Sequence, residues 1–214
     1  MAGEFNPYIG AESQLRHMSF KKDYGGNILK HNAPQYNFYI GIRPIKNFGI
    51  EAGYEATNTR TRTTELHTGD LVNGVQIPAD FSPITFKSKH KVRGPHINIT
   101  GFYAPFNEDD TFELFGSVGI SFNKHAFERE NIRIKTLPIS SIRIASDRKP
   151  ILRFNIGFEN MWTEYLGTRF SLGLQKTNQI TIYANDGVKS LVIPVIQPKD
   201  SIIYGYGLGL FYKF

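Results

Sequence analysis

The chain has 214 residues, a formal net charge of +6, an aromatic content of 14%, 20 glycines and no cysteine. The length suits one domain or a single barrel, and the absence of cysteine excludes disulfides and thiol chemistry. The sequence contains no apolar run long enough for a transmembrane helix, but a membrane-spanning strand carries its apolar residues only in alternate positions.

Eight segments share one pattern, in which large apolar side chains alternate with glycine or polar ones. Residues 1–5 (MAGEF) precede them without signal-peptide character, so we expect an added or disordered N-terminus on a single domain spanning 1–214. Successive side chains of a strand point to opposite faces, so the alternation predicts strands, each near the length that crosses a bilayer. The predicted strands are 7–16, 35–43, 48–56, 96–103, 112–122, 151–159, 166–175 and 204–214.

The connections between these strands alternate in length. Short ones occur at PIKN, APFNEDD and NMWTEY, and long ones at 18–34, 57–95, 123–149 and 176–200. Short turns on one side and long loops on the other are typical of outer-membrane barrels. The sequence therefore predicts an all-β fold: an eight-stranded antiparallel up-and-down transmembrane β-barrel with short periplasmic turns and long extracellular loops.

The polar faces of the predicted strands carry balanced charge. An unpaired charge inside a barrel is costly, and eight strands enclose a space that side chains just fill, so the balance predicts internal ion pairs. The predicted lumen charge network consists of Glu12, Arg16, Arg43, Glu51, Glu55, Glu113, Arg153, Glu159, Arg169 and Lys213. A soluble lipocalin-like barrel with an apolar interior is the alternative, but aromatic residues near the strand ends favour membrane girdles.

The last segment, YGYGLGLFYKF, has the strictest alternation in the chain. It resembles the C-terminal signal that the barrel-assembly machinery is taken to read in bacterial outer-membrane proteins. The assembly-signal residues would be Tyr206, Leu208, Leu210, Tyr212 and Phe214.

Together with PYIGAE, FGIEAGYE and INITGFYAPF, this ending makes the chain similar to the small barrels of the OmpA/OmpX/opacity-protein superfamily. The resemblance implies a bacterial outer-membrane protein, a monomer surrounded by outer-membrane lipid and lipopolysaccharide, with a polar plug rather than an open pore. No nucleic-acid partner is expected.

The positive charge is concentrated in the four long connections. They hold nineteen Lys or Arg against nine Asp or Glu, with clusters at 87–93 and 124–135. The predicted basic extracellular patch consists of Lys87, Lys89, Lys91, Arg93, Lys124, Arg129, Arg133 and Lys135. Such a patch would attract lipopolysaccharide phosphates or a sulfated host glycan or protein ligand in a salt-dependent way. An ordinary solvated surface is the other interpretation.

Two long connections contain strand patterns of their own. Residues 131–145 alternate isoleucine with basic residues, and Asp186-Gly187 indicates a type I′ hairpin within 180–193. We expect strands that continue beyond the membrane as a protruding sheet. Its edges would either pair with a partner strand or only stiffen the loops.

Catalytic motifs are largely missing from the sequence. It has no phosphate-binding glycine loop, no metal-spaced cluster and no nucleophile elbow, so we expect no cofactor, no metal and no enzymatic activity. His17 and Ser19 resemble the His-x-Ser pair of lipid A deacylases, but on the wrong strand and with no obvious acid. The predicted function is an envelope-structural protein or a surface adhesin or antigen. The alternatives are a small channel or transporter for small solutes or apolar molecules and, remotely, a lipid A-modifying hydrolase.

Overall fold

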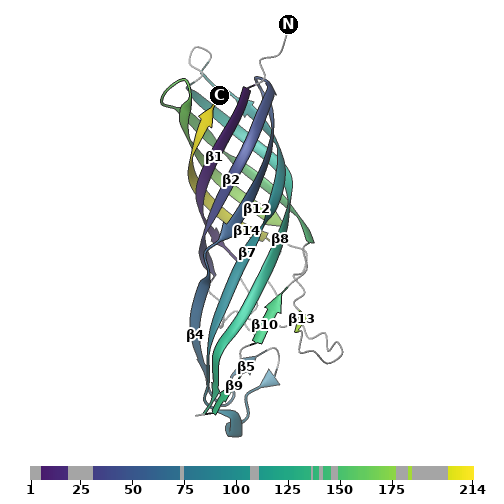
Figure 1. Ribbon diagram of the computed structural model, residues 1–214, viewed down its shortest axis with the longest axis vertical. Helices are drawn as coiled ribbons and strands as arrows, with labels where there is room; N and C mark the ends of the chain where they lie inside the picture. The colour runs from purple at the N-terminus through teal and green to yellow at the C-terminus, as the bar shows by residue number, and fades with distance from the viewer. Residues whose placement is uncertain are drawn as a thin grey trace.

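The protein folds into a closed, tilted barrel with a sheet that protrudes from one end (Figure 1). The computed structural model describes residues 6–18, 31–72, 75–106, 111–135, 137–139, 142–145, 149–176, 183–184 and 202–214. Within these ranges, the helical structure is one 3-10 turn, η2 (Ala79–Phe81). None of the described helices is long and apolar enough to span a membrane.

Eight antiparallel strands close the barrel. Each pairs with the next barrel strand along the chain, and the last pairs with the first, from Tyr8↔Lys213 to His17↔Tyr204. The barrel strands are β1 (Asn6–His17), β2 (Asn32–Ile45), β3 (Phe48–Thr57), β7 (Ile84–Tyr103), β8 (Phe112–Ile134), β11 (Lys149–Met161), β12 (Leu166–Lys176) and β14 (Ile202–Lys213). The predicted eight-stranded up-and-down barrel is confirmed.

The alternation along each strand separates an apolar outside from a polar inside. On β2, Phe38 and Ile40 are each 63% exposed, whereas Asn37 and Tyr39 between and beside them are buried. The same arrangement holds on β14, where Leu208 is exposed and the neighbouring glycines are covered. A continuous apolar outer wall is what a lipid bilayer solvates, so the lipocalin-like alternative, with its apolar interior, does not apply.

The start of β1 and the end of β14 lie at the end of the barrel that carries the β2–β3 and β11–β12 turns (Figure 1). The backbone N–H of Lys213 donates to the Tyr165 carbonyl at 2.7 Å, and that of Phe214 donates to the Pro7 carbonyl at 3.0 Å. These bonds join the last strand to the β11–β12 turn and to β1. The closing seam of the barrel is therefore hydrogen-bonded up to the last residue.

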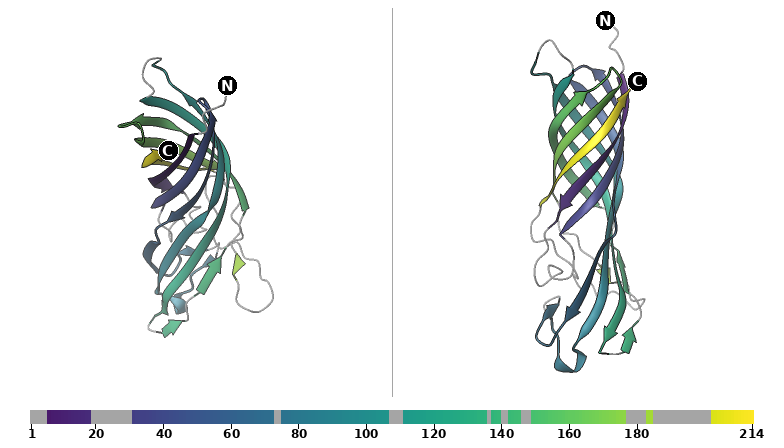
Figure 2. Two further views of the ribbon diagram at one scale, coloured as in Figure 1. Left: turned by 45° about the horizontal axis from the view of Figure 1, so that its top comes forward. Right: turned by 90° about the vertical axis from the view of Figure 1, so that its left-hand side faces the viewer.

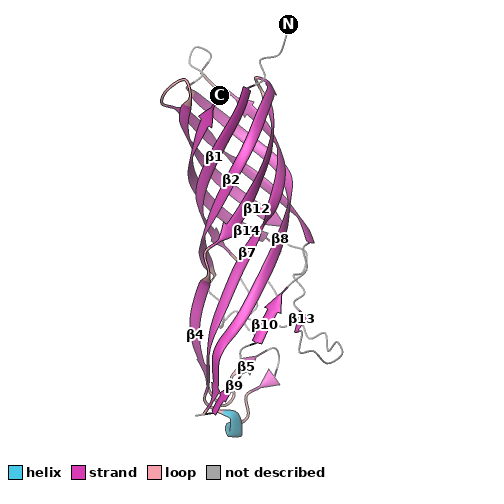
Figure 3. Ribbon diagram, viewed as in Figure 1, coloured by secondary structure: helices cyan, strands magenta, loops and turns pink. Residues whose placement is uncertain are grey.

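The protruding sheet is built on extensions of β7 and β8 at the opposite end (Figure 2, right). β4 (Arg60–Leu66) pairs with β7, while β10 (Ile142–Ala145) pairs with β8, and β13 (Tyr183–Ala184) pairs with β10. β9 (Leu137–Ile139) folds back on β8, and the small hairpin of β5 (Leu71–Val72) and β6 (Val75–Gln76) lies nearby (Figure 3). The protruding sheet predicted from 131–145 is confirmed, whereas Asp186-Gly187 lies outside the described residues.

Residues 87–93 and 124–130 belong to strands, although the sequence pattern predicted loops there. One face of this two-stranded extension carries basic side chains, and the other carries Phe86 and Ile132, which pack with Leu66 in a small apolar cluster. The expectation of loops was wrong because charged residues in alternate positions, such as the lysines of β7 and the glutamates of β8, hide the pattern of a strand that buries only its other face.

Candidate functional site

Ion pairs fill the turn side of the lumen. Arg43 Nη1 lies 2.6 Å from Glu113 Oε2, and the Arg43 guanidinium also contacts Glu159. Arg169 Nη2 lies 2.6 Å from Glu51 Oε1 and 2.5 Å from Glu159 Oε1. Lys213 Nζ lies 3.6 Å from Glu113 Oε2. The turn-side cluster therefore has three acids and three bases, contributed by six strands: Arg43, Glu51, Glu113, Glu159, Arg169 and Lys213.

Aromatic rings pack around the turn-side cluster. Tyr8 donates a 2.7 Å hydrogen bond to Glu51, and its ring meets that of Tyr39 edge to face at 6.3 Å. In the β1–β2 register, Tyr8 lies opposite Gly41, and Tyr39 lies opposite Gly10. A Cβ atom at either glycine would overlap the facing ring, so both positions must lack a side chain. The glycines thus make room for the rings that cover the ion pairs.

Arginine side chains in this layer also stack on rings. The Arg43 guanidinium carbon lies 3.5 Å from the centroid of the Phe102 ring. That of Arg169 lies 4.5 Å from the Tyr39 ring and 4.8 Å from the Phe115 ring. Cation–π contacts of this kind stabilise a guanidinium that has lost its water.

A second set of charges lies nearer the protruding sheet and centres on Glu55. Arg16 Nη2 and Arg153 Nη1 each lie 3.2 Å from Glu55 Oε2. Gln35 donates to the same carboxylate at 2.7 Å, Gln175 donates at 3.1 Å, and Asn123 also donates to it. Glu55 of β3 thus accepts bonds from five other strands and ties the barrel together across its lumen.

Glu12 completes this sheet-side cluster, which comprises Glu12, Arg16, Glu55 and Arg153. Gln14 donates to Glu12 at 2.8 Å, and Ser171 also donates to it. Two acids balance two bases here, so each of the two clusters is neutral by itself. A buried charge without a partner nearby is costly, so the stability of the barrel depends on neutrality within each cluster more than on the total charge of the lumen.

The ten charged residues predicted for the lumen all lie on the inner faces of their strands. Nine are buried, and Lys213 at the turn-side mouth is half-buried. Sequence reasoning missed the amides and the tyrosine that complete the two clusters: Tyr8, Gln14, Gln35, Asn123 and Gln175. The sequence did place them on the inner face, because they occupy the same alternate positions of their strands as the charged residues. It did not show which of the charged residues each one contacts.

The protruding sheet has two chemically different faces. Lys87, Lys89, Lys91 and Arg93 alternate along β7 on one face, and Lys89 Nζ lies 2.5 Å from Glu130 Oε1 of β8. On the other face, His90 stacks on Phe127 at 4.2 Å, and its Nε2 lies 3.3 Å from Nδ1 of His125, all three residues being buried.

The structure divides the predicted basic patch. Arg129 lies on the buried face, with its guanidinium carbon 5.2 Å from the Phe86 ring, and burial lowers the pKa of Arg129. The β7–β8 register shifts between Thr85 and Lys87 of β7, beside Asn131 of β8, which has a φ of 51°. The side chains of β8 therefore change faces at this bulge. Beyond the bulge, at the tip of the sheet, two further members of the predicted patch are exposed: Arg133 and Lys135.

His17, half of the pair compared with lipid A deacylases, lies at the sheet-side rim of the barrel. Its Nδ1 is 2.6 Å from the Asn32 side-chain oxygen, and its ring stacks on Tyr204 at 4.9 Å. Ser19 lies outside the described residues. In the described part of the chain, no group of three or more His, Cys, Asp or Glu residues is placed to hold a metal ion.

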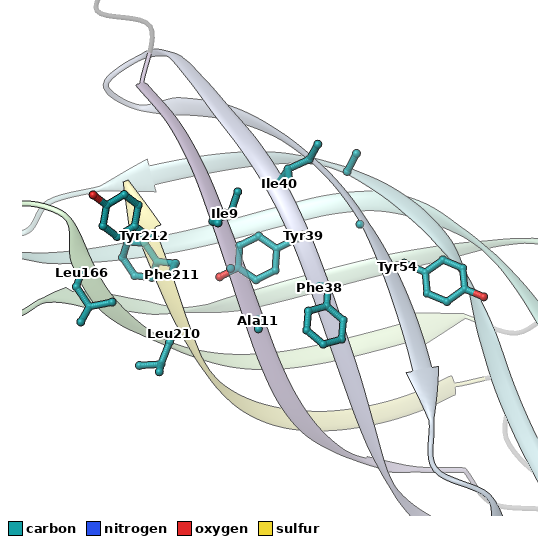
Figure 4. A pocket seen from close by; sticks show the side chains of 13 residues that line it. Ile9, Ala11, Phe38, Tyr39, Ile40, Tyr54, Leu166, Leu210, Phe211 and Tyr212 are labelled. Atoms are coloured by element: carbon teal, nitrogen blue, oxygen red, sulfur yellow. The ribbon is translucent and has the colours of Figure 1, made fainter. Parts of the chain in front are cut away.

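A shallow apolar depression marks the outer wall where β1, β2 and β3 run beside β14 (Figure 4). The small outward side chains of Ala11 and Ala52 leave it open, and Ile9, Phe38 and Ile40 border it. Its lining is almost entirely apolar, and it forms part of the outer wall that the aromatic residues of β14 continue. The depression therefore belongs to the lipid-facing surface.

Solved structures share this fold over nearly the whole chain. Outer membrane protein OprG from Pseudomonas aeruginosa matches with a TM-score of 0.57 and 14% identity, over 98% of this chain and 96% of OprG. A major outer membrane protein from Thermus thermophilus matches with a TM-score of 0.57 and 12% identity, over 97% and 99% of the two chains. Neisserial surface protein A matches with a TM-score of 0.53 and 8% identity, over 98% and 97%.

At such low identity, these matches show the fold alone. The chain has the fold of small bacterial outer-membrane β-barrels, as its C-terminal resemblance implied. No protein-family model matches the sequence, and comparison with curated protein sequences gives no match.

Proposed function

We propose that the protein is a non-enzymatic barrel of the bacterial outer membrane that holds a protruding sheet outside the cell, as a surface adhesin or antigen. The observation that carries the proposal is the continuation of β7 and β8 past the barrel into a sheet that β4 and β10 widen. A sheet with an edge strand, projecting from a membrane anchor, is suited to contact with an external partner.

The state of the lumen supports display rather than transport. Two neutral clusters cross it, and Glu55 alone connects side chains from five other strands. Opening a path for a solute would require breaking buried ion pairs, at roughly 3–5 kcal/mol each. A small channel is therefore the less favoured function.

The tip of the protruding sheet supports a polyanionic partner. Arg133 and Lys135 are exposed there, at the point farthest along β8 from the barrel. An exposed pair of cations attracts sulfated or phosphorylated polysaccharides, and salt weakens that attraction. We take a sulfated host glycan as the ligand class to test first.

The test measures heparin binding to the barrel refolded in nanodiscs across a salt titration. We expect binding that weakens with salt and falls several-fold in the double variant Arg133→Gln/Lys135→Gln. The control is Lys46→Gln on the turn side, which removes one cation far from the tip and should bind as the unaltered protein does. Absence of heparin binding, or equal loss in the control, would contradict this proposal.

A further inference from the structure

The outer face of β7 and β8 changes abruptly from apolar to cationic at one level. On β7, the outward residues Ile99, Ile97 and Pro95 are followed by Arg93, and on β8 the outward residue Phe122 is followed by Lys124. Arg93 and Lys124 are direct partners in the register. The boundary therefore runs straight across both strands.

The position of this boundary fits the outer edge of the membrane. From Tyr103 to Pro95 the strand makes eight residue steps, roughly 27 Å along its axis and about 20 Å along the membrane normal at a tilt of ~40°. The apolar band of outer-membrane barrels is about 25 Å tall. Arg93 and Lys124, the next outward residues, lie at the level of lipid headgroups.

Among the described strand pairs, no acid lies directly opposite the positive charges at this level. The partners of Arg93 are Ala56 and Lys124, and the partner of Lys91 is Ala126. Like charges directly opposite each other destabilise a sheet. Further from the barrel the pattern differs, since Lys89 and Lys87 face Glu128 and Glu130 across the strands.

We propose that Lys91, Arg93 and Lys124, here called the rim triad, bind the phosphate of a phosphorylated lipid in the outer leaflet. A phosphate brings several acceptor oxygens to both strands and removes the repulsion between them. The apolar residues below, Ile97 and Phe122, contact the acyl chains of the same lipid. This inference rests on the proposed membrane location and assigns the rim triad to anchoring, apart from the ligand at the tip.

The test uses native mass spectrometry of the refolded protein in detergent with diphosphoryl lipid A. The variant Arg93→Gln/Lys124→Gln should bind it roughly thirtyfold more weakly, since each cation at a membrane surface strengthens binding about fivefold. The matched control is Lys87→Gln/Lys89→Gln, which removes the same charge farther out and should change binding by less than about threefold. A second variant, Ala126→Glu, keeps every cation, places one carboxylate opposite Lys91 and should also weaken binding.

Three results would overturn the inference. The first is that Lys87→Gln/Lys89→Gln weakens lipid A binding as much as Arg93→Gln/Lys124→Gln does. The second is that lipid A without phosphates binds as strongly as diphosphoryl lipid A. The third is that inositol hexakisphosphate displaces the lipid as well as free lipid A does, which would indicate a site for free phosphates. Heparin binding is measured on the same variants and on Arg133→Gln/Lys135→Gln. If heparin binding is lost only in Arg133→Gln/Lys135→Gln and lipid binding is unaffected by Arg93→Gln/Lys124→Gln, the rim triad is rejected and the proposed function is kept. If instead heparin binding is unchanged in Arg133→Gln/Lys135→Gln and lipid binding is weakened in Arg93→Gln/Lys124→Gln, the proposed function alone is rejected.

Discussion

Single residues in this protein differ widely in how much of the fold depends on them. Glu55 is almost fully buried and accepts bonds from side chains on five other strands. Two of its donors are guanidinium groups, and a buried charge that loses its partner is strongly destabilising. An exposed acid of the same type, such as Glu65 on the edge strand β4, stabilises the fold far less.

Replacing Glu55 should therefore destabilise the barrel. Glu55→Gln leaves Arg16 and Arg153 without their carboxylate, and we expect a loss of roughly 3–5 kcal/mol in the free energy of unfolding. Urea titration of the protein in detergent, followed by tryptophan fluorescence, measures it. The control is Glu65→Gln, and similar stability of the two variants would show that Glu55 does not hold the strands together.

The elements of the protein fall into two groups that are stabilised differently. Barrel strands are held on both sides by neighbours in a closed ring, and their inner faces are ion-paired. The protruding sheet has an open edge at β4, and its small apolar cluster consists of Leu66, Phe86 and Ile132. Fewer buried contacts predict lower local stability for the sheet than for the barrel.

Ile132→Ala should loosen the protruding sheet and leave the barrel intact. The lost packing costs about 2–5 kcal/mol for a buried isoleucine. Hydrogen exchange should become faster for amides in 84–91 and 125–134 and stay unchanged in 96–103. Leu137→Ala, at a site 70% exposed, serves as the control. Faster exchange throughout the barrel would show that the two parts unfold together.

At the scale of the whole molecule, the filled lumen makes the barrel an anchor. The turn-side cluster and the sheet-side cluster are each neutral, so neither needs the other for charge balance. The lumen should therefore be blocked at two levels along the barrel axis. An ion that passed one cluster would still meet the second.

Planar bilayer recordings test this closure. We expect no resolvable single-channel current from the unaltered protein. Glu55→Ala/Arg153→Ala keeps the lumen neutral but empties part of the sheet-side cluster, so it should add at most small, brief openings because the turn-side cluster persists. A steady conductance in the unaltered protein would favour the channel alternative.

The sequence by itself determined the barrel strands, their inward and outward faces and the charge balance of the lumen. Side-chain alternation is a local property of extended backbone, so it can be recognised without knowing which strands are neighbours. It also indicated that some strands continue outside the membrane, although it mistook residues 87–93 of β7 and 124–130 of β8 for loops.

Only the tertiary structure decided which charges meet and how the basic residues are divided. Glu55 contacts Arg16 and Arg153, which are 39 and 98 residues away, because closure and register align the inner faces of distant strands. The bulge near Asn131 placed Arg133 on the opposite face from Arg129, and the pairing of β7 with β8 placed Arg93 opposite Lys124. Such contacts depend on the shift between strands, which no single segment encodes.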